Sequence, residues 1–287
     1  MINAHLRASD FAEVWHHLVY LLLNSPITSP RGKTCRERIG VTLRVYNARA
    51  NVLGTPDRKL NYKFMVAEWL WIQCGRNDVS TIAQYNPNIA AFSDDGVVFA
   101  GAYGAPIAEQ WARVRDTLRN DHNTRQAVFQ IYRPPTGPTK DVPCTIALQF
   151  LIRDEKLNVI ATMRSSDVWL GLPYDFFNFT MLANAMSAEV GVELGEAVMQ
   201  LGSSHLYASD EERAKETISW KGDGPVTITS PQFIESVPSQ MEDALMTPSI
   251  LQLGLKTPWA QYANVLRSVN QTSALTQLME LNDAAQR

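Results

Sequence analysis

The stretch CTIALQFLIRDEKLNVIATMRSSDVWLGLPYDFFNF, residues 144–179, decides how this chain folds. Its first part, 144–167, has two strand-like apolar runs joined at 153–156, which predicts two β-strands side by side. A Gly-Leu-Pro turn follows, and Asp175 then lies between aromatic residues. Because an unpaired buried charge is costly, we expect Asp175 to have a partner, either within the protein or in a substrate.

The segments around this stretch mix helical and strand patterns. Apolar residues recur at helical spacing in several segments, and alternating runs lie between them. We expect helices at 10–24, 63–75, 109–121, 179–191 and near 258–285, a short helix from 80, and strands at 41–53, 127–132 and 196–209. Residues 24–40 and 133–143 contain the Pro, Gly and polar residues that are typical of loops. The fold class is therefore mixed α/β (α+β), with strands dominating the centre.

The composition is that of an ordinary globular protein. Of the 287 residues, 45% are hydrophobic and 19% are charged, and the net charge of −3 offers no general attraction to nucleic acid. Three scattered cysteines fit neither a disulfide framework nor a zinc site, so we expect free thiols and no metal. The apolar run 19–23 is too short to span a membrane and no secretory signal is recognisable, so we expect a cytoplasmic protein without a membrane partner.

Cys144 is a candidate nucleophile, because it begins a strand directly after a long polar loop. A thiolate needs nearby positive charge, and Arg164 supplies it if the two strands pair. The alternative is a buried structural thiol, which is the commoner role of a single cysteine.

Other polar residues are ambiguous when each is taken alone. His205 and Tyr207 share one face of a strand and could bind a sugar hydroxyl, or they could be a surface pair. Arginine suits phosphate, but dispersed arginines are usually solvated; the candidates are Arg31, Arg125, Arg133 and Arg164. Glu68 lies in an apolar helix, where a carboxyl either pairs with a cation or has a shifted pKa.

Six blocks of the chain, taken together and in order, resemble the thymidylate synthase superfamily. RSSDVWLGLPYDFFNF is similar to the family's RSxDxxLGLPFNIxxY, VPCTIALQF to its PCHxxxQF, and LGSSHLYAS to its GDxHxYxNH. AEWLWIQCG, GAYG and NTRQAVF are similar to HELLWFLxG, GPVYG and DSRRIIV. The blocks lie within residues 10–220. The resemblance implies a single thymidylate synthase-like domain over 1–287, with a divergent C-terminal extension from about 221, and a large mixed sheet that is flanked by helices and used for dimerisation.

The departures from the family pattern indicate a cytidylate hydroxymethylase. Synthases have Asn at the position of Asp175, and the cytidylate hydroxymethylase branch has Asp. A protonated carboxyl accepts a hydrogen bond from cytosine N4 and donates one to N3, whereas Asn suits uracil. Thr145 replaces the His that follows the nucleophile in synthases, and IAAFSDD replaces their Trp-containing loop.

The resemblance implies a reaction in which the Cys144 thiolate adds to pyrimidine C6 and C5 takes a one-carbon unit from 5,10-methylenetetrahydrofolate. Water then gives a 5-hydroxymethyl product, and dCMP is slightly favoured over CMP. The implied catalytic residues are Cys144, Asp175, Glu68, which organises water and proton transfer, and Tyr103, which supports C5 deprotonation. The alternatives are a divergent thymidylate synthase, a dUMP hydroxymethylase, and an inactive nucleotide-binding homologue.

The resemblance also implies the binding residues. The 5′-phosphate contacts Arg31, Arg164, Ser165 and, across a homodimer with shared phosphate sites, Arg125 of the other subunit. His205 and Tyr207 contact the sugar. Glu68, Asp167 and Gly171 lie near the folate. Arg133 has no family counterpart, and its role stays open.

Overall fold

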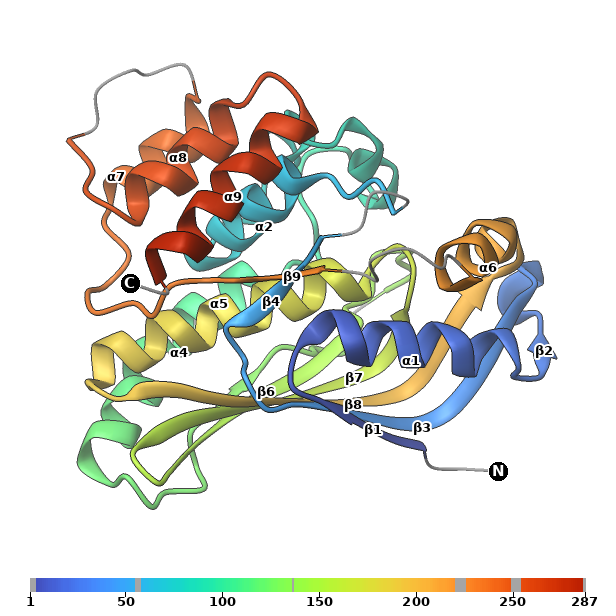
Figure 1. Cartoon of the computed structure of the whole chain (residues 1–287), viewed down its shortest axis with the longest axis horizontal. Helices are drawn as coiled ribbons and strands as arrows, with labels where there is room; N and C mark the ends of the chain where they lie inside the picture. The colour runs from blue at the N-terminus through green and yellow to red at the C-terminus, as the bar shows by residue number, and fades with distance from the viewer. Residues whose placement is uncertain (1–3, 55–57, 136, 220–225, 249–253, 286–287) are drawn as a thin grey trace.

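A seven-stranded sheet forms the base of the molecule in the computed structural model, which describes residues 4–54, 58–135, 137–219, 226–248 and 254–285 (Figure 1). The strand order is β1-β3-β8-β7-β6-β5, and β2 pairs with β3. The strands are β1 Ala4–Ala8, β2 Ile27–Thr28, β3 Cys35–Val45, β5 Val128–Gln130, β6 Thr145–Arg153, β7 Lys156–Asp167 and β8 Glu193–Tyr207. A separate two-stranded sheet joins β4 Ala50–Gly54 to β9 Val226–Thr229. The large mixed sheet is as predicted.

The centre of the sheet combines an antiparallel hairpin with a parallel crossover. β6 and β7 pair antiparallel, and the hairpin turns at Asp154 and Glu155, whose φ angles of 52° and 56° fit a two-residue turn of type I′. β7 and β8 pair in parallel through helix α5, Leu172–Val190. The predicted hairpin is therefore confirmed. The start of β6 and the ends of β7 and β8 meet at one end of the sheet.

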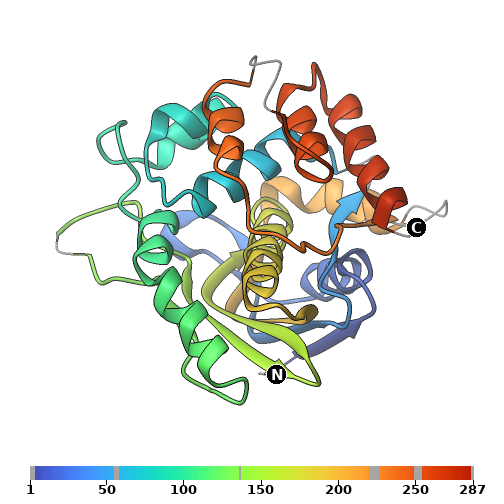
Figure 2. The ribbon, with the colours of Figure 1, turned by 90° about the vertical axis from the view of Figure 1, so that its left-hand side faces the viewer.

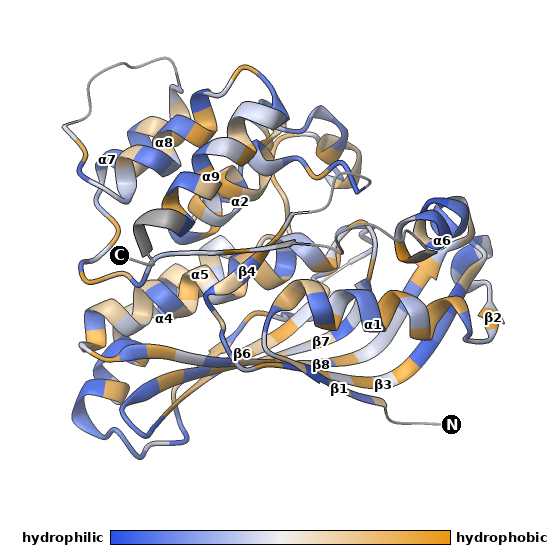
Figure 3. Ribbon diagram, in the orientation of Figure 1, coloured by the Kyte–Doolittle hydropathy of each residue, from blue (hydrophilic) through white to orange (hydrophobic). Residues whose placement is uncertain are grey.

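Helices cover the sheet in two layers. α1, Phe11–Leu23, and α5 lie against one face of the sheet, and α4, Gly104–Asn120, packs beside α5. Figure 2 shows α5 between the sheet and a second layer. That layer consists of α2 Tyr62–Gln73, α7 Gln240–Met246, α8 Trp259–Arg267 and α9 Gln271–Ala285, while α3 Val79–Ala83 and α6 Glu211–Ser219 lie at the edges. Figure 3 shows polar residues dominating α6.

The layers make α5 one of the most buried elements in the chain. Its side chains from Phe176 to Ser187 are all buried. Trp69 of α2 packs against Phe177 of α5 and against Phe233 and Tyr262 from the C-terminal part of the chain. The residues after β9 therefore contribute to the same hydrophobic core. Within the described part of the chain, no helix has the length and apolar character needed to cross a membrane.

Several elements differ from the sequence-based expectation. The predicted strand 41–53 is divided between β3 and β4, which belong to different sheets. α5 begins at Leu172, seven residues before the predicted 179, because Pro173 stands in its first turn, where it needs no hydrogen-bond donor. The second half of the predicted loop 24–40 is strand, since Cys35 onwards pairs with β8. The predicted helix 258–285 is two helices, and the Asn270 side chain accepts from the Ser273 amide at 2.9 Å at the start of the second.

Candidate active site

Cys144 lies where the loop 137–143 enters β6, next to Arg164 of β7. The Arg164 amide donates to the Cys144 carbonyl at 2.9 Å, and its Nη2 lies 3.8 Å from Cys144 Sγ. The guanidinium also donates to the carbonyls of Val142 and Pro143, at 2.9 Å each. The pairing of β6 with β7 thus brings a cation to the thiol, as the strand-pairing argument requires.

The surroundings of Cys144 nevertheless favour the protonated thiol. Burial raises its pKa, and the charge of Asp175 raises it further, while Arg164 and Arg31 act in the opposite direction. Desolvation outweighs the two guanidinium groups. A change in the site must therefore accompany deprotonation of this thiol.

Asp175 lies in the first turn of α5, where its amide donates to the Gly171 carbonyl at 3.0 Å. Burial raises the pKa of Asp175 well above its usual range, and the charges of Glu68 and Asp167 add to this. Its surroundings therefore favour the protonated carboxyl, which has one donor and one acceptor oxygen. A Cβ at Gly171 would lie 3.5 Å from Asp175 Oδ2, which is ordinary van der Waals contact.

Glu68 of α2 and Tyr103 complete a half-buried titratable cluster with Asp175. Burial raises the pKa of Glu68 to about 7, and a hydrogen bond from Asn178 Nδ2 to Oε2 at 2.8 Å opposes this rise. Burial also raises the pKa of Tyr103, with further contributions from Asp175, Cys144 and Glu68. A carboxyl with a pKa near 7 both takes up and releases protons at neutral pH, so Glu68 is suited to general acid–base work.

Glu68→Gln should remove part of the pH dependence of stability. The pKa of Glu68 is raised in the folded protein from 4.5 to about 7, so in this window the native state keeps a proton that the unfolded chain has released. The free energy of unfolding should therefore fall as pH rises through the window, by about 3 kcal/mol from this group. Urea unfolding at about pH 5 and about pH 8 measures the fall, which should be smaller by that amount in Glu68→Gln. Equal falls in the two proteins would contradict the assignment.

His205 and Tyr207 lie on β8 beside Asp167 of β7. Asp167 and His205 are register partners, and the His205 and Tyr207 rings are 5.0 Å apart. Burial lowers the pKa of His205, although Asp167 and Glu37 favour its charged form. Asp167 Oδ1 accepts from the amides of Trp169 and Leu170 at 2.8 and 2.9 Å. A neutral imidazole beside a phenol can both donate to and accept from a sugar hydroxyl.

Arg31 and Ser165 lie at the same end of the sheet. Arg31 is exposed in a short turn with a φ of 53°, and its charge affects Cys144, His205 and Tyr207. Ser165 is the register partner of Ser203 on β8. An exposed cation at Arg31 and the hydroxyl of Ser165 next to Arg164 give the donors that a phosphate needs.

Arg125 and Arg133 lie away from this cluster. Arg125 is exposed, and its carbonyl accepts from Gln149 Nε2 at 3.0 Å, towards the other end of β6. Arg133 Nη2 forms an exposed ion pair with Glu109 Oε2 at 2.5 Å. The structure therefore does not bring Arg125 to the thiol of its own chain.

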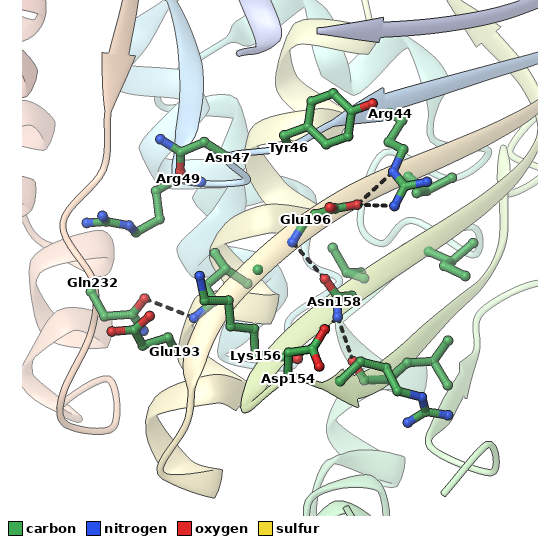
Figure 4. Close-up of a pocket in the computed structure, with 17 residues that line it drawn as sticks. Arg44, Tyr46, Asn47, Arg49, Asp154, Lys156, Asn158, Glu193, Glu196 and Gln232 are labelled. Carbon is green, nitrogen blue, oxygen red and sulfur yellow. Dashed lines mark hydrogen bonds and ion pairs between the residues drawn. The ribbon is translucent and has the colours of Figure 1, made fainter. Parts of the chain in front are cut away.

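A pocket of about 920 Å³ lies at the opposite end of the sheet from Cys144 (Figure 4). Glu196 pairs there with Arg44 Nε at 2.7 Å, and Asn158 Oδ1 accepts from the Glu196 amide at 2.9 Å. None of the predicted site residues is among those that line the pocket. Within the described residues, no cluster of His, Cys, Asp or Glu is placed to hold a metal ion.

Three polar residues near the site were missed in the sequence. Asn178 binds Glu68, and its i+3 spacing from Asp175 was a usable signal. Asp141 Oδ2 accepts from the Gly101 amide at 2.9 Å and so joins the loop before Cys144 to the segment before Tyr103. Glu37, the register partner of His205, accepts from the Ser203 hydroxyl at 2.5 Å. Neither Asp141 nor Glu37 has a sequence signal, because both act across strands or loops.

Comparison with known proteins gives a consistent result. The sequence model of the family described as thymidylate synthase matches residues 27–230. A deoxyuridylate hydroxymethyltransferase of Bacillus phage SP01 is 33% identical over 204 residues, which are 64% of this chain and 53% of that one. A thymidylate synthase of Listeria monocytogenes serotype 4a (strain HCC23) is 30% identical over 112 residues, 39% of this chain and 36% of that one. One of Francisella philomiragia is 24% identical over 187 residues, 56% of this chain and 67% of that one.

The chain spans about half the length of the first of these relatives and about a third of the second. The family match covers more than two thirds of the chain and includes Glu68, Cys144, Asp175 and His205. By this match, and by the arrangement of its sheet, the chain belongs to the thymidylate synthase family.

Proposed function

We propose that this protein transfers a one-carbon unit from 5,10-methylenetetrahydrofolate to C5 of a cytidine nucleotide and adds water, giving the 5-hydroxymethyl nucleotide. dCMP is slightly favoured over CMP. The observation that carries the proposal is Asp175, a half-buried carboxyl with a raised pKa. Among the described residues, no cation forms an ion pair with it. A neutral carboxyl donates to cytosine N3 and accepts from N4.

The residues around Cys144 suit the covalent step. The Cys144 thiol loses its proton and adds to C6, which makes C5 nucleophilic. Phosphate bound by Arg31, Arg164 and Ser165 holds the nucleotide over the sulfur. Tyr103 assists removal of the C5 proton as tetrahydrofolate leaves the one-carbon unit, and Glu68 positions the water that adds to the exocyclic methylene that remains. Elimination of the thiolate then restores Cys144 and releases the product.

The folate supplies the one-carbon unit at the oxidation level of formaldehyde. The chain offers suitable chemistry for its pterin ring where β7 leads into α5. Leu170, 51% exposed, gives an apolar surface next to the Asp167 carboxyl, and Gly171 leaves room beside them. We assign Asp167, Gly171 and Glu68 to this part of the site.

A second candidate function is 5-hydroxymethylation of dUMP. It is favoured by the similarity to a protein named as a deoxyuridylate hydroxymethyltransferase. Asp175 argues against it in its ionised form, because a carboxylate oxygen facing uracil O4 leaves both acceptors without a donor.

A competition assay separates the candidates. Equal dCMP, CMP and dUMP are incubated with the protein and 5,10-methylenetetrahydrofolate, and the products are identified by mass spectrometry. A hydroxymethyl product on a cytidylate supports the proposal and identifies the sugar. A product on dUMP alone overturns it, and the presence of a methyl or a hydroxymethyl group then decides between a synthase and a dUMP hydroxymethylase.

We also propose a homodimer with shared phosphate sites. The helices in the described part of the chain lie on one side of the sheet (Figure 1), and the exposed face of the sheet includes Ile39, 57% exposed, and Ile146. Large exposed apolar residues on a sheet face are typical of an interface. Arg125 lies far from the thiol of its own chain, which suits a role in the site of the partner subunit.

Mixing two inactive variants should restore activity if Arg125 acts across the dimer. Cys144→Ser and Arg125→Ala homodimers each lack one component in both sites. In the mixed dimer, one site has both Cys144 and Arg125, so random exchange should give about a quarter of wild-type activity. Turnover is measured after co-refolding, and light scattering establishes the dimer. Absence of recovery in a confirmed mixed dimer would place Arg125 in its own subunit's site or outside both.

A further inference from the structure

Asn178 is a buried amide on α5, one helical turn after Asp175. Its side chain is on the same face as Asp175, because residues three apart on a helix are neighbours. Nδ2 donates to Glu68 Oε2 at 2.8 Å, and the residue is 1% exposed. Among the described residues, Asn178 Oδ1 has no hydrogen-bond donor. The amide is therefore held at one end and unsatisfied at the other.

Asn184, another buried amide of α5, has no unsatisfied acceptor. Asn184, also 1% exposed and two turns further on, uses both ends of its side chain. Its Nδ2 donates to the Pro231 carbonyl at 2.8 Å, and its Oδ1 accepts from the Phe233 amide at 2.9 Å. Because a buried acceptor without a donor destabilises the folded state, the unsatisfied oxygen of Asn178 calls for a donor that arrives from outside the protein.

We infer that Asn178 is a second base-selecting residue, whose Oδ1 accepts from the amino group on C4 of the pyrimidine. This rests on the proposed function. The cytosine N4 group carries two N–H bonds: one points to the N3 side, where Asp175 accepts it, and the other points to the C5 side. Asn178 lies next to Glu68, which acts at C5, so its oxygen is placed for the second N–H.

The hydrogen bond to Glu68 makes this contact selective. An Asn side chain that was free to rotate could turn its NH₂ group to uracil O4. Here the NH₂ group is held by Glu68 Oε2, so Oδ1 faces the base. Uracil would then place O4 against the Asn178 oxygen, which has no hydrogen to donate. Asn178 Oδ1 is shielded from solvent in the structure. The contact therefore requires the side chains around it to shift when the base binds.

Nucleotide binding by Asn178→Ala tests the inference. The ligands are dCMP, dUMP and the deoxyribonucleotide of pyrimidin-2-one, which has only hydrogen at C4. We expect the Kd of dCMP to rise about tenfold, as for loss of one buried hydrogen bond, and that of the pyrimidin-2-one nucleotide to stay unchanged. Calorimetric titration without folate measures binding apart from the chemistry of Glu68.

Asn184→Ala is the matched control, because it truncates a buried amide of the same helix and should leave the ratio of dCMP to pyrimidin-2-one affinity unchanged. If Asn178→Ala fails to fold, Asn178→Ser provides the same comparison with a smaller change. Equal weakening of both ligands, or no weakening, would overturn the inference. The wild-type protein tests the proposed function separately: preference for dUMP over dCMP would refute that function, whatever the variants do.

Discussion

Asp175→Asn should move the preferred substrate from cytidylate to dUMP. In the proposed complex the protonated carboxyl of Asp175 donates to N3 and accepts from N4, whereas an amide would offer its NH₂ group to O4 and its oxygen to N3–H. Sites built on such polar pairs discriminate strongly, because the wrong base leaves buried groups unpaired. We expect kcat/KM for the cytidylate to fall by roughly a hundredfold to a thousandfold, and that for dUMP to rise.

Parallel assays on dCMP, CMP and dUMP measure this shift. Asp167→Asn is the control, since Asp167 is a second carboxyl with a raised pKa in the same site. That change should impair turnover through the folate without altering the ratio of cytidylate to dUMP. If the ratio stays constant in Asp175→Asn, or moves equally in both variants, Asp175 does not read the base.

Cys144→Ser should abolish turnover while leaving nucleotide affinity nearly intact. A serine hydroxyl is far less nucleophilic than a thiolate, and the covalent bond to C6 is the step on which the rest depends. We expect kcat to fall by at least about ten-thousandfold and the Kd of the nucleotide to change by about twofold or less. A 5-fluorocytidylate with folate should give a mass adduct on the wild-type protein and none on the variant.

Cys74→Ser is the corresponding control, because Cys74 caps the C-terminus of α2 and belongs to no part of the site. It should keep both turnover and the adduct. Normal turnover of Cys144→Ser would refute the nucleophile assignment. Loss of nucleotide binding together with turnover would show that Cys144 supports the shape of the site and would leave its chemistry unproven.

The elements with strong local signals could be predicted from the sequence. The β6–β7 hairpin follows from two apolar runs around 153–156, and this pairing alone places Arg164 beside Cys144. The strand from Cys35 was missed because its alternation is masked by charged residues. Those residues are partly buried by pairing with β8, a contact that local patterns do not encode.

The candidate site was predicted unevenly for a related reason. Asp175 and His205 were identified because they lie in segments whose sequence resembles that of the family. The raised pKa of Glu68 required the packing of α2 on α5, which buries both carboxyls together. The role of Asn178 depends on which of its two polar ends finds a partner, and only three-dimensional contacts decide that.

The carbonyl contacts of Arg164 have a consequence for handling the protein. The Arg164 guanidinium donates to the carbonyls of Val142 and Pro143. Burial favours the protonated thiol of the neighbouring Cys144. Oxidants and alkylating reagents attack the thiolate, so we expect Cys144 to react slowly with both. Screens that rank cysteines by intrinsic reactivity would therefore miss Cys144. An electrophilic inhibitor would need a phosphate group that binds beside Cys144 and favours its thiolate.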